Sequence, residues 1–131
     1  MQRPDATILV VDDDAPMRMI VSLSLKLCGY LVIVAGNGQE ALGLAQANPH
    51  IRVIVLDVVM SGLAGTELAA RLTEILPTAA VLFCSGHAPS ALTRYGIDPA
   101  SANFIQKPCS GPALQQKIEE LMPVLQDGTP Q

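Results

Sequence analysis

The sequence predicts an α/β protein in which helices cover both faces of a five-stranded parallel sheet. Five short runs rich in Val, Ile and Leu alternate with segments of helical periodicity. Three of the runs are almost continuously apolar, which is typical of strands buried on both faces of a parallel sheet. Because strand and helix alternate throughout, right-handed crossovers place helices on both faces, in three α/β/α layers.

The five expected strands are short, and no repeat or low-complexity segment separates them. At 131 residues the chain is predicted to be one domain, 1–131, with an ordered core of about 6–126. The strands are expected at Thr7–Val11, Leu31–Val34, Val53–Leu56, Ala80–Cys84 and Asn103–Ile105.

The first two helices are predicted from their periodicity and their ends. Gly29 is expected to stop the first helix. Asn37, three residues before Glu40, predicts an N-cap for a second helix over Gly38–Ala47. The inward residues of the first helix are expected to be Met17, Ile20, Val21, Ser24 and Cys28.

Three further helices are expected between and after the later strands. Pro77 ends the third, and Ser90–Tyr95 is a short, weakly marked fourth. Ser110 is expected to cap the last helix. The inward residues are expected to be Leu68, Leu72 and Ile75 in the third helix, and Leu114, Ile118, Leu121 and Leu125 in the last.

Composition excludes several classes of protein. Hydrophobic residues make up 50% of the chain and charged residues 15%, which supports a buried core and not a disordered chain. The net charge is −4, the eight Lys and Arg residues are scattered, and the only aromatic residues are two Tyr and two Phe. A nucleic-acid surface needs clustered cations or a stacking platform, so we expect no direct contact with nucleic acid.

The chain is also expected to be cytoplasmic and to have no membrane association. Its apolar stretches are all broken before 18 residues, and its first residues lack the pattern of a signal peptide. Cys28, Cys84 and Cys109 are far apart, which is typical of reduced thiols and not of a disulfide framework or a metal cluster.

Polar side chains follow four of the expected strands. In an open parallel sheet, ligands bind outside the carboxyl ends of the strands, so these side chains are expected at one edge. The second strand ends in Ala35 and Gly36 and contributes no functional group. The other strands are followed by Asp12, Asp13 and Asp14, by Asp57, by Ser85 and by Lys107.

This set of groups predicts phosphoryl chemistry assisted by a metal ion. Carboxylates held together repel, so that one takes up a proton unless a cation intervenes. A site with few carboxylates and several waters suits Mg²⁺. A carboxylate beside a metal and a lysine is a competent nucleophile toward phosphorus, because the cations neutralise charge on the transferring oxygens.

The chain resembles the receiver domains of two-component response regulators, and is similar to the small chemotaxis regulator, over essentially its full length. The segments that carry this resemblance are ILVVDDDAPMRMIV, VIVLDVVMSGLAG, VLFCSG and NFIQKP. Together, in this order and spacing, they are specific, whereas each alone is weak. The resemblance implies a flavodoxin-like sheet of strand order 2-1-3-4-5 with five helices.

The resemblance also implies a role for each polar strand end. Asp57 is expected to accept the phosphoryl group from a phosphohistidine of a sensor histidine kinase or a histidine phosphotransfer domain. Asp13 is expected to bind Mg²⁺ directly and Asp12 directly or through water. Asp57 and the backbone carbonyl of Val59 complete the expected magnesium ligands.

Two further side chains are implied to respond to the phosphoryl group. Ser85 is expected to hydrogen-bond a phosphoryl oxygen, while Lys107 pairs first with Asp57 and then with the phosphate. Phe104 occupies the position of an aromatic switch that turns inward as Ser85 moves. That change repacks the face formed by Ser90–Tyr95, the last strand and the last helix, where a homodimer is also a candidate.

The sequence departs from the family pattern at several positions. Ser61 replaces the usual proline after the phosphoacceptor, and Cys109 replaces a bulky aromatic residue. Val59 and His87 flank the expected phosphoryl group. Because apolar Val59 cannot orient a hydrolytic water, the phosphorylated state is expected to be long-lived, unless His87 holds that water.

A second apolar stripe on the first helix predicts a docking surface. Met19, Leu23 and Leu27 recur four residues apart, outside the expected inward face. We expect Met19, Leu23, Cys109 and Ser110 to contact a kinase or phosphotransfer domain. The alternative is that Leu27 and part of the stripe pack under the last helix.

We expect a signalling switch that is not an enzyme acting on a separate substrate. Three other classes of protein are alternatives to this interpretation. They are a Mg²⁺-dependent phosphatase with an aspartyl intermediate, a nucleotide or flavin binder, and a degenerate receiver used only for contacts. A nucleotide binder needs a Gly-rich phosphate loop where Asp12–Asp14 stand. The similarity of VLFCSGHA and FIQKP to receivers in hybrid sensor kinases favours a domain of such a protein over a stand-alone regulator.

Overall fold

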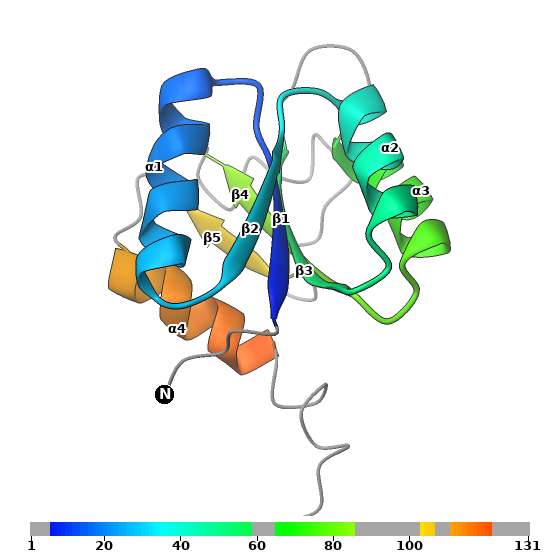
Figure 1. The fold of residues 1–131 in the computed structure, drawn as a ribbon. Coiled ribbons are helices and arrows are strands. Elements are labelled where there is room, and N and C mark those ends of the chain that lie inside the picture. The colour runs from blue at the N-terminus through cyan, green and yellow to red at the C-terminus, as the bar shows by residue number, and fades with distance from the viewer. Residues whose placement is uncertain (1–5, 59–64, 86–102, 107–110, 122–131) are drawn as a thin grey trace, which may run out of the picture.

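A five-stranded parallel sheet forms the centre of the molecule (Figure 1). The structure is a computed structural model that describes residues 6–58, 65–85, 103–106 and 111–121. The strand order β2-β1-β3-β4-β5 confirms the expected doubly wound, flavodoxin-like topology. The strands are β1 (Thr7–Val11), β2 (Leu31–Ala35), β3 (Ile51–Asp57), β4 (Ala80–Ser85) and β5 (Phe104–Gln106).

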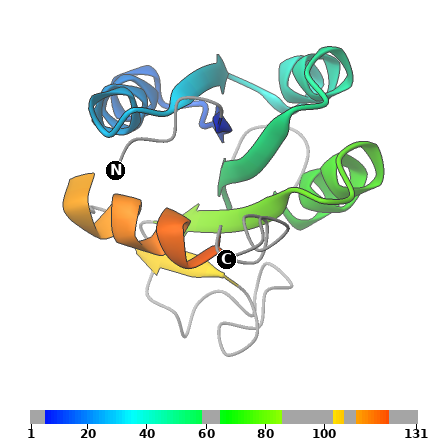
Figure 2. The same ribbon diagram turned by 60° about the horizontal axis from the view of Figure 1, so that its bottom comes forward.

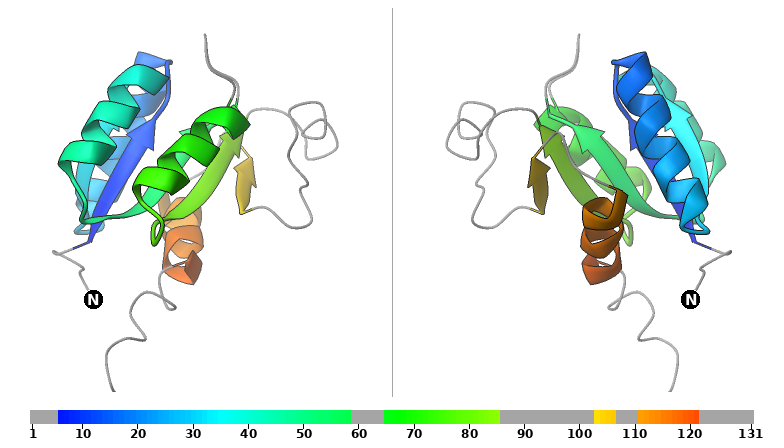
Figure 3. Two further views of the ribbon diagram at one scale, coloured as in Figure 1. Left: turned by 90° about the vertical axis from the view of Figure 1, so that its right-hand side faces the viewer. Right: turned by 90° about the vertical axis from the view of Figure 1, so that its left-hand side faces the viewer.

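Helices cover both faces of the sheet (Figures 2 and 3). One face carries the helices α1 (Ala15–Leu27) and α4 (Gly111–Leu121), and the other carries α2 (Gly38–Ala47) and α3 (Gly65–Ile75). The helix expected at Ser90–Tyr95 lies outside the described residues. None of the helices that the structure describes is long and apolar enough to cross a membrane.

The core consists of two apolar layers, one on each side of the sheet. In β1, Ile8 and Val10 face the layer beneath α1 and α4, and Leu9 and Val11 face the layer beneath α2 and α3. All five residues of β1 are buried. This explains why the strand is continuously apolar in sequence, because a central strand has no face in water.

Several strands differ by one or two residues from the predicted bounds. β3 begins at Ile51 and ends at Asp57, so it includes residues before and after the apolar run Val53–Leu56. Backbone pairing causes the extension, because Thr7 of β1 lies opposite Ile51, and Asp57 lies opposite Cys84 of β4. Pairing therefore continues beyond the apolar side chains.

The N-terminus of α2 has the predicted cap. The Asn37 side chain accepts a hydrogen bond from the Glu40 backbone N–H at 2.8 Å. The Glu40 carboxylate in turn accepts from the backbone N–H of Gly36 at 2.6 Å. This reciprocal pair fixes the turn between β2 and α2, because it satisfies backbone donors on both sides of the helix start.

The predicted inward face of α1 is wrong at Ile20, which is 58% exposed. The buried residues of α1 are Val21, Ser22 and Leu25, and Met17 and Cys28 pack at the margin of the core. At about 100° per residue, Ile20 lies about 100° from Val21 and about 140° from Leu25. It therefore belongs to the outer side of the helix.

Candidate metal centre at the carboxyl edge of the sheet

Three carboxylates from two neighbouring strands lie together at the carboxyl edge of the sheet. One carboxylate oxygen each of Asp12, Asp13 and Asp57 lies within 4.8 Å of the other two. The sheet register explains this arrangement, because Val11 of β1 pairs with Leu56 of β3. The residues that follow this pair are Asp12 and Asp57, so both carboxylates leave the sheet at the same level.

Asp12 is positioned by hydrogen bonds to its main chain and to its carboxylate. It is buried, and its backbone N–H donates to the carbonyl of Ala35 at 3.2 Å. Its own carbonyl accepts a hydrogen bond from Nη1 of Arg18 at 2.7 Å. Its Oδ1 accepts from the backbone N–H of Asp14 at 2.9 Å. The main chain and the carboxylate are thus held by β2, by α1 and by the following turn.

Asp57 is also buried, whereas Asp13 is exposed. Asp57 is the last residue of β3, and the next backbone N–H, that of Val58, donates to the carbonyl of Cys84 at 3.0 Å. Pairing with β4 therefore continues past Asp57 and fixes its main chain. Two buried carboxylates and one exposed carboxylate make a site that is rigid on the inside and open to solvent.

The donor set fits a hard divalent cation. All three groups offer oxygen, and the cluster contains no His or Cys among the residues that the structure describes. Mg²⁺ prefers oxygen ligands at about 2.1 Å and keeps several waters, so two ligand oxygens on one ion lie roughly 3 to 4 Å apart. Small side-chain rotations from the observed spacing reach this range.

Sequence reasoning missed Arg18, whose guanidinium supports the residue that carries the first carboxylate. Gly36 leaves room for it, since a Cβ on Gly36 would lie 3.0 Å from Arg18 Nη1. Pro16 places the start of α1 in the sequence, and Arg18 follows within the first turn, from which a long side chain can reach back to Asp12. The end of β2, which brings no polar side chain, contributes this space.

The structure locates the other predicted site residues in part. The backbone of Ser85 ends β4, opposite Gln106 of β5. Phe104 begins β5 opposite Phe83 and is half-buried. The remaining residues named for the site and its surroundings lie outside the described residues, and they are Val59, His87, Lys107, Cys109 and Ser110.

α1 presents an exposed apolar surface, which we call the α1 outer face and define as Met19, Ile20, Leu23 and Leu27. Met19 is 70% exposed and Leu23 is 57% exposed. The alternative in which Leu27 packs under the last helix is wrong, because Leu27 is 79% exposed. A Cβ on Gly111, the first residue of α4, would lie 3.5 Å from Ser24, so α4 begins beside α1.

Known proteins match this chain over most of its length. The family model described as response regulator receiver domain matches residues 8–119. The response regulator receiver protein CpdR of Brucella abortus (strain 2308) is 34% identical over 115 residues, which cover 88% of this chain and 95% of CpdR.

Two further matches concern a histidine kinase. The sensor kinase CckA of the same strain is 32% identical over 118 residues, which cover 89% of this chain but 12% of the kinase. A crystal structure of the receiver domain from the hybrid histidine kinase CckA aligns with a TM-score of 0.74 and 30% identity, covering 88% of this chain and 98% of that domain. The chain thus spans nearly all of a small relative and a small part of a large one.

Proposed function

We propose, from the premise that this chain belongs to the response regulator receiver domain family, that Asp57 is its phosphoacceptor in two-component signalling. The observation that carries the proposal is the convergence of Asp12, Asp13 and Asp57 within 4.8 Å at the carboxyl edge of the sheet. A lone acidic residue after a strand is commonly a turn residue. Three from two adjacent strands, two of them buried, repel one another, and this favours the binding of a cation.

The reaction is a phosphoryl transfer from a phosphohistidine. A carboxylate oxygen of Asp57 forms a bond to phosphorus while the P–N bond breaks, and the histidine, whose other ring nitrogen carries a proton, leaves as a neutral imidazole with the electron pair of that bond. Asp12, Asp13, Asp57 and the carbonyl of Val59 would hold Mg²⁺. When bound, this ion neutralises negative charge on the transferring phosphoryl oxygens.

Other features of this chain would orient the acceptor, balance the charge of the product and transmit the change to the surface. Burial of Asp57 at the end of β3 limits the orientations of its carboxylate, so that little ordering remains to be done when the donor arrives. Lys107 would balance the charge of the product, and Ser85 would bond a phosphoryl oxygen. Movement of Ser85 would let half-buried Phe104 turn inward and change the surface of β5 and α4.

A mass measurement tests the assignment. The full chain is incubated with acetyl phosphate and Mg²⁺, and the intact mass is expected to rise by one phosphoryl group. The gain should vanish in Asp57→Asn and in excess chelator. Asp14→Asn is the matched control, since Asp14 is an exposed neighbour outside the carboxylate cluster. A gain that persists in Asp57→Asn would reject Asp57 as the acceptor, and turnover of a separate phosphate ester would favour the phosphatase alternative.

The partner is proposed to be a sensor histidine kinase or a histidine phosphotransfer domain that contacts the α1 outer face, with Cys109 and Ser110. Support comes from the exposure of Met19 and Leu23 and from the position of Gly111 beside α1. A large exposed apolar surface rimmed by polar residues is typical of a protein-binding site.

Charge substitutions test this surface. Met19→Asp and Leu23→Asp are expected to lower the rate of phosphotransfer from a phosphorylated kinase at least tenfold. Burying an unpaired carboxylate in an apolar contact is strongly unfavourable. Phosphorylation by acetyl phosphate should remain as in the wild type, which shows that the fold and the acceptor are intact. Ala70→Asp, at an exposed apolar position of α3 on the opposite side of the sheet, is the control that should transfer normally. Unchanged transfer in both α1 variants would refute the docking surface.

A further inference from the structure

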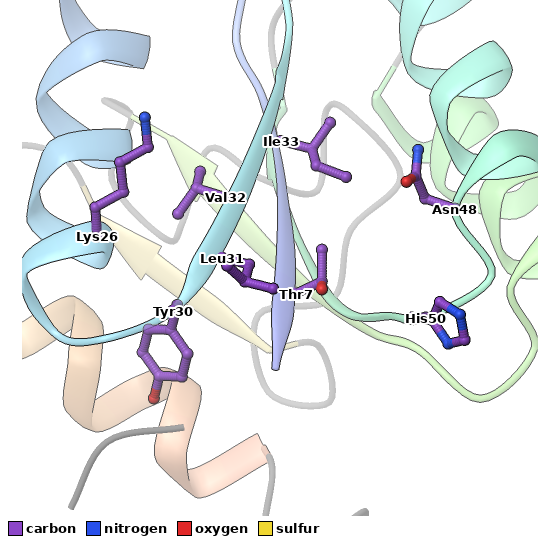
Figure 4. A pocket seen from close by; sticks show the side chains of 8 residues that line it. All are labelled: Thr7, Lys26, Tyr30, Leu31, Val32, Ile33, Asn48 and His50. Carbon is purple, nitrogen blue, oxygen red and sulfur yellow. The ribbon is translucent and has the colours of Figure 1, made fainter. Parts of the chain in front are cut away.

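The open edge of β2 is the floor of a groove that the receiver reaction does not use. β2 ends the sheet, and its one neighbour among the described strands is β1. The groove has a volume of about 430 Å³. Its lining residues come from β1, α1, β2 with the preceding Tyr30, and the connection from α2 to β3. Figure 4 shows Lys26 on one side of β2 and Asn48 and His50 on the other.

The backbone of β2 offers hydrogen-bonding groups in this groove. Leu31 donates its N–H to the carbonyl of Ala6 at 3.0 Å, and the carbonyl of Ala35 accepts from Asp12 at 3.2 Å. In a parallel pair, alternate residues bond to the neighbouring strand, so Leu31 and Ala35 belong to the set that faces β1. Val32 and Val34 belong to the other set, whose N–H and C=O groups point away from β1 toward the open edge.

The edge lacks the features that usually discourage strand pairing. β2 contains no charge and no proline, and both Leu31 and Val34 are exposed. Natural edge strands are commonly blocked by Lys, Pro or a bulge. By contrast, the other edge strand of the described sheet, β5, has three residues. An extended segment can therefore add to β2 through main-chain bonds, with apolar side chains against Leu31 and Val34.

The charge of the groove indicates which kind of polypeptide segment would bind there. Among the described residues that line the groove, Lys26 is the one with a full positive charge, Asn48 and His50 add polar groups, and none carries a carboxylate. A second copy of this chain is a poor fit, because α1 and α2 flank β2 and would meet the same two helices of the copy (Figure 2). A single extended strand with an acidic residue fits between the helices.

We propose that the β2 edge binds an extended, apolar peptide segment of a partner protein that carries a carboxylate, by strand addition beside Lys26. The site is separate from the phosphoryl centre. Thr7 and Leu31 pair at the start of the strands, whereas Asp12 follows the pair Val11 and Ala35. Four residues at about 3.3 Å each separate the start of the groove from the level of Asp12 by roughly 13 Å, and the groups of Val34, at the other end of the site, point away from β1. The proposal therefore stands independently of the acceptor role of Asp57.

Two short blocked peptides of alternating valine and threonine serve as probes, one beginning with glutamate and the other with lysine. Each is titrated into the full, isotope-labelled chain and followed by NMR. Strand addition predicts saturable shifts of the backbone amides of Val32 and Val34. The acidic probe is expected to bind about three to five times more tightly than the basic one, as for an exposed ion pair.

Three variants make the test decisive. Lys26→Glu should invert the preference between the probes, whereas Lys117→Glu, the same change on α4, should leave it unaltered. Val34→Pro removes an outward N–H but no bond to β1, and should abolish binding of both probes with little change in the melting temperature, because Val34 is 41% exposed. The proposal is overturned if the shifts lie elsewhere, if Lys26→Glu keeps the wild-type preference, or if sedimentation shows that the free chain is a dimer which the proline variant cannot form.

Discussion

Gly36 shows how a residue without a side chain contributes to the metal centre. The Arg18 guanidinium occupies the space beside Gly36 and from there donates to the carbonyl of Asp12 at 2.7 Å. A methyl group at Gly36 would lie 3.0 Å from Nη1, closer than ordinary van der Waals contact. Arg18 would have to move, and its bond to the main chain of Asp12 would lengthen or break.

We therefore predict that Gly36→Ala weakens magnesium binding about two- to fivefold, the equivalent of one hydrogen bond of roughly 0.5–1 kcal/mol. The free energy of unfolding should change by less than about 1 kcal/mol, because the end of a flexible side chain can yield and alanine restricts the unfolded chain. Isothermal titration with MgCl₂ measures the first effect and urea unfolding the second.

Gly43→Ala is the matched control for this prediction. Gly43 lies within α2, and a Cβ there would have nothing within 4 Å. The substitution should raise the free energy of unfolding by about 1 kcal/mol, the difference in helix propensity between glycine and alanine, without any effect on magnesium. Equal magnesium affinity in the wild type and Gly36→Ala would show that Arg18 does not position Asp12.

At the scale of single elements, α2 depends on the polar turn at its start. The Asn37 side chain accepts from Glu40, and the Glu40 carboxylate accepts from Gly36. Asn37→Ala removes the first bond and is expected to lower the free energy of unfolding by about 1 kcal/mol. Gln39→Ala, an exposed change in the same turn, should be neutral or slightly stabilising. Chemical denaturation of both variants decides, and equal stabilities would mean that the Asn37 cap contributes nothing.

The strands and helices also show which sequence signals were sufficient to predict the fold. The apolar runs located all five strands to within two residues, since buried parallel strands are apolar on both faces. The inward face of α1 was less well predicted, because this helix carries apolar residues both on its buried face and on its exposed face. Ile20 looks like a core residue in sequence, yet it belongs to the outer face. Periodicity cannot separate a core face from a docking face when both are apolar.

At the scale of the molecule, the sequence predicted where Asp12, Asp13 and Asp57 converge because sheet topology alone brings neighbouring strand ends together. It could not predict Arg18 or the space at Gly36. Those contacts depend on the distance between the turn after β1 and the turn after β2. The β2 groove was missed for a similar reason, since an edge strand and a central strand have similar apolar sequences and differ in their position in the sheet.

The crowding of carboxylates links the stability of the whole domain to magnesium. Like charges about 4 Å apart repel by about 1 kcal/mol even in water, and two of the three carboxylates here are buried. An ion that binds the folded chain and not the unfolded chain stabilises it by about 2.7 kcal/mol at a concentration one hundred times the dissociation constant. The melting temperature of the wild type should therefore rise steadily with MgCl₂.

Asp13→Asn separates this effect from general salt effects. Without magnesium the variant should be more stable than the wild type, by about 1 kcal/mol, because one of three like charges is gone. Added magnesium should raise the melting temperature of Asp13→Asn much less than that of the wild type. The wild type should therefore become the more stable of the two as the magnesium concentration increases. NaCl at equal ionic strength is the reference, since screening alone would relieve the repulsion without specific binding. If NaCl reproduces the rise caused by MgCl₂, the three carboxylates do not form a cation site.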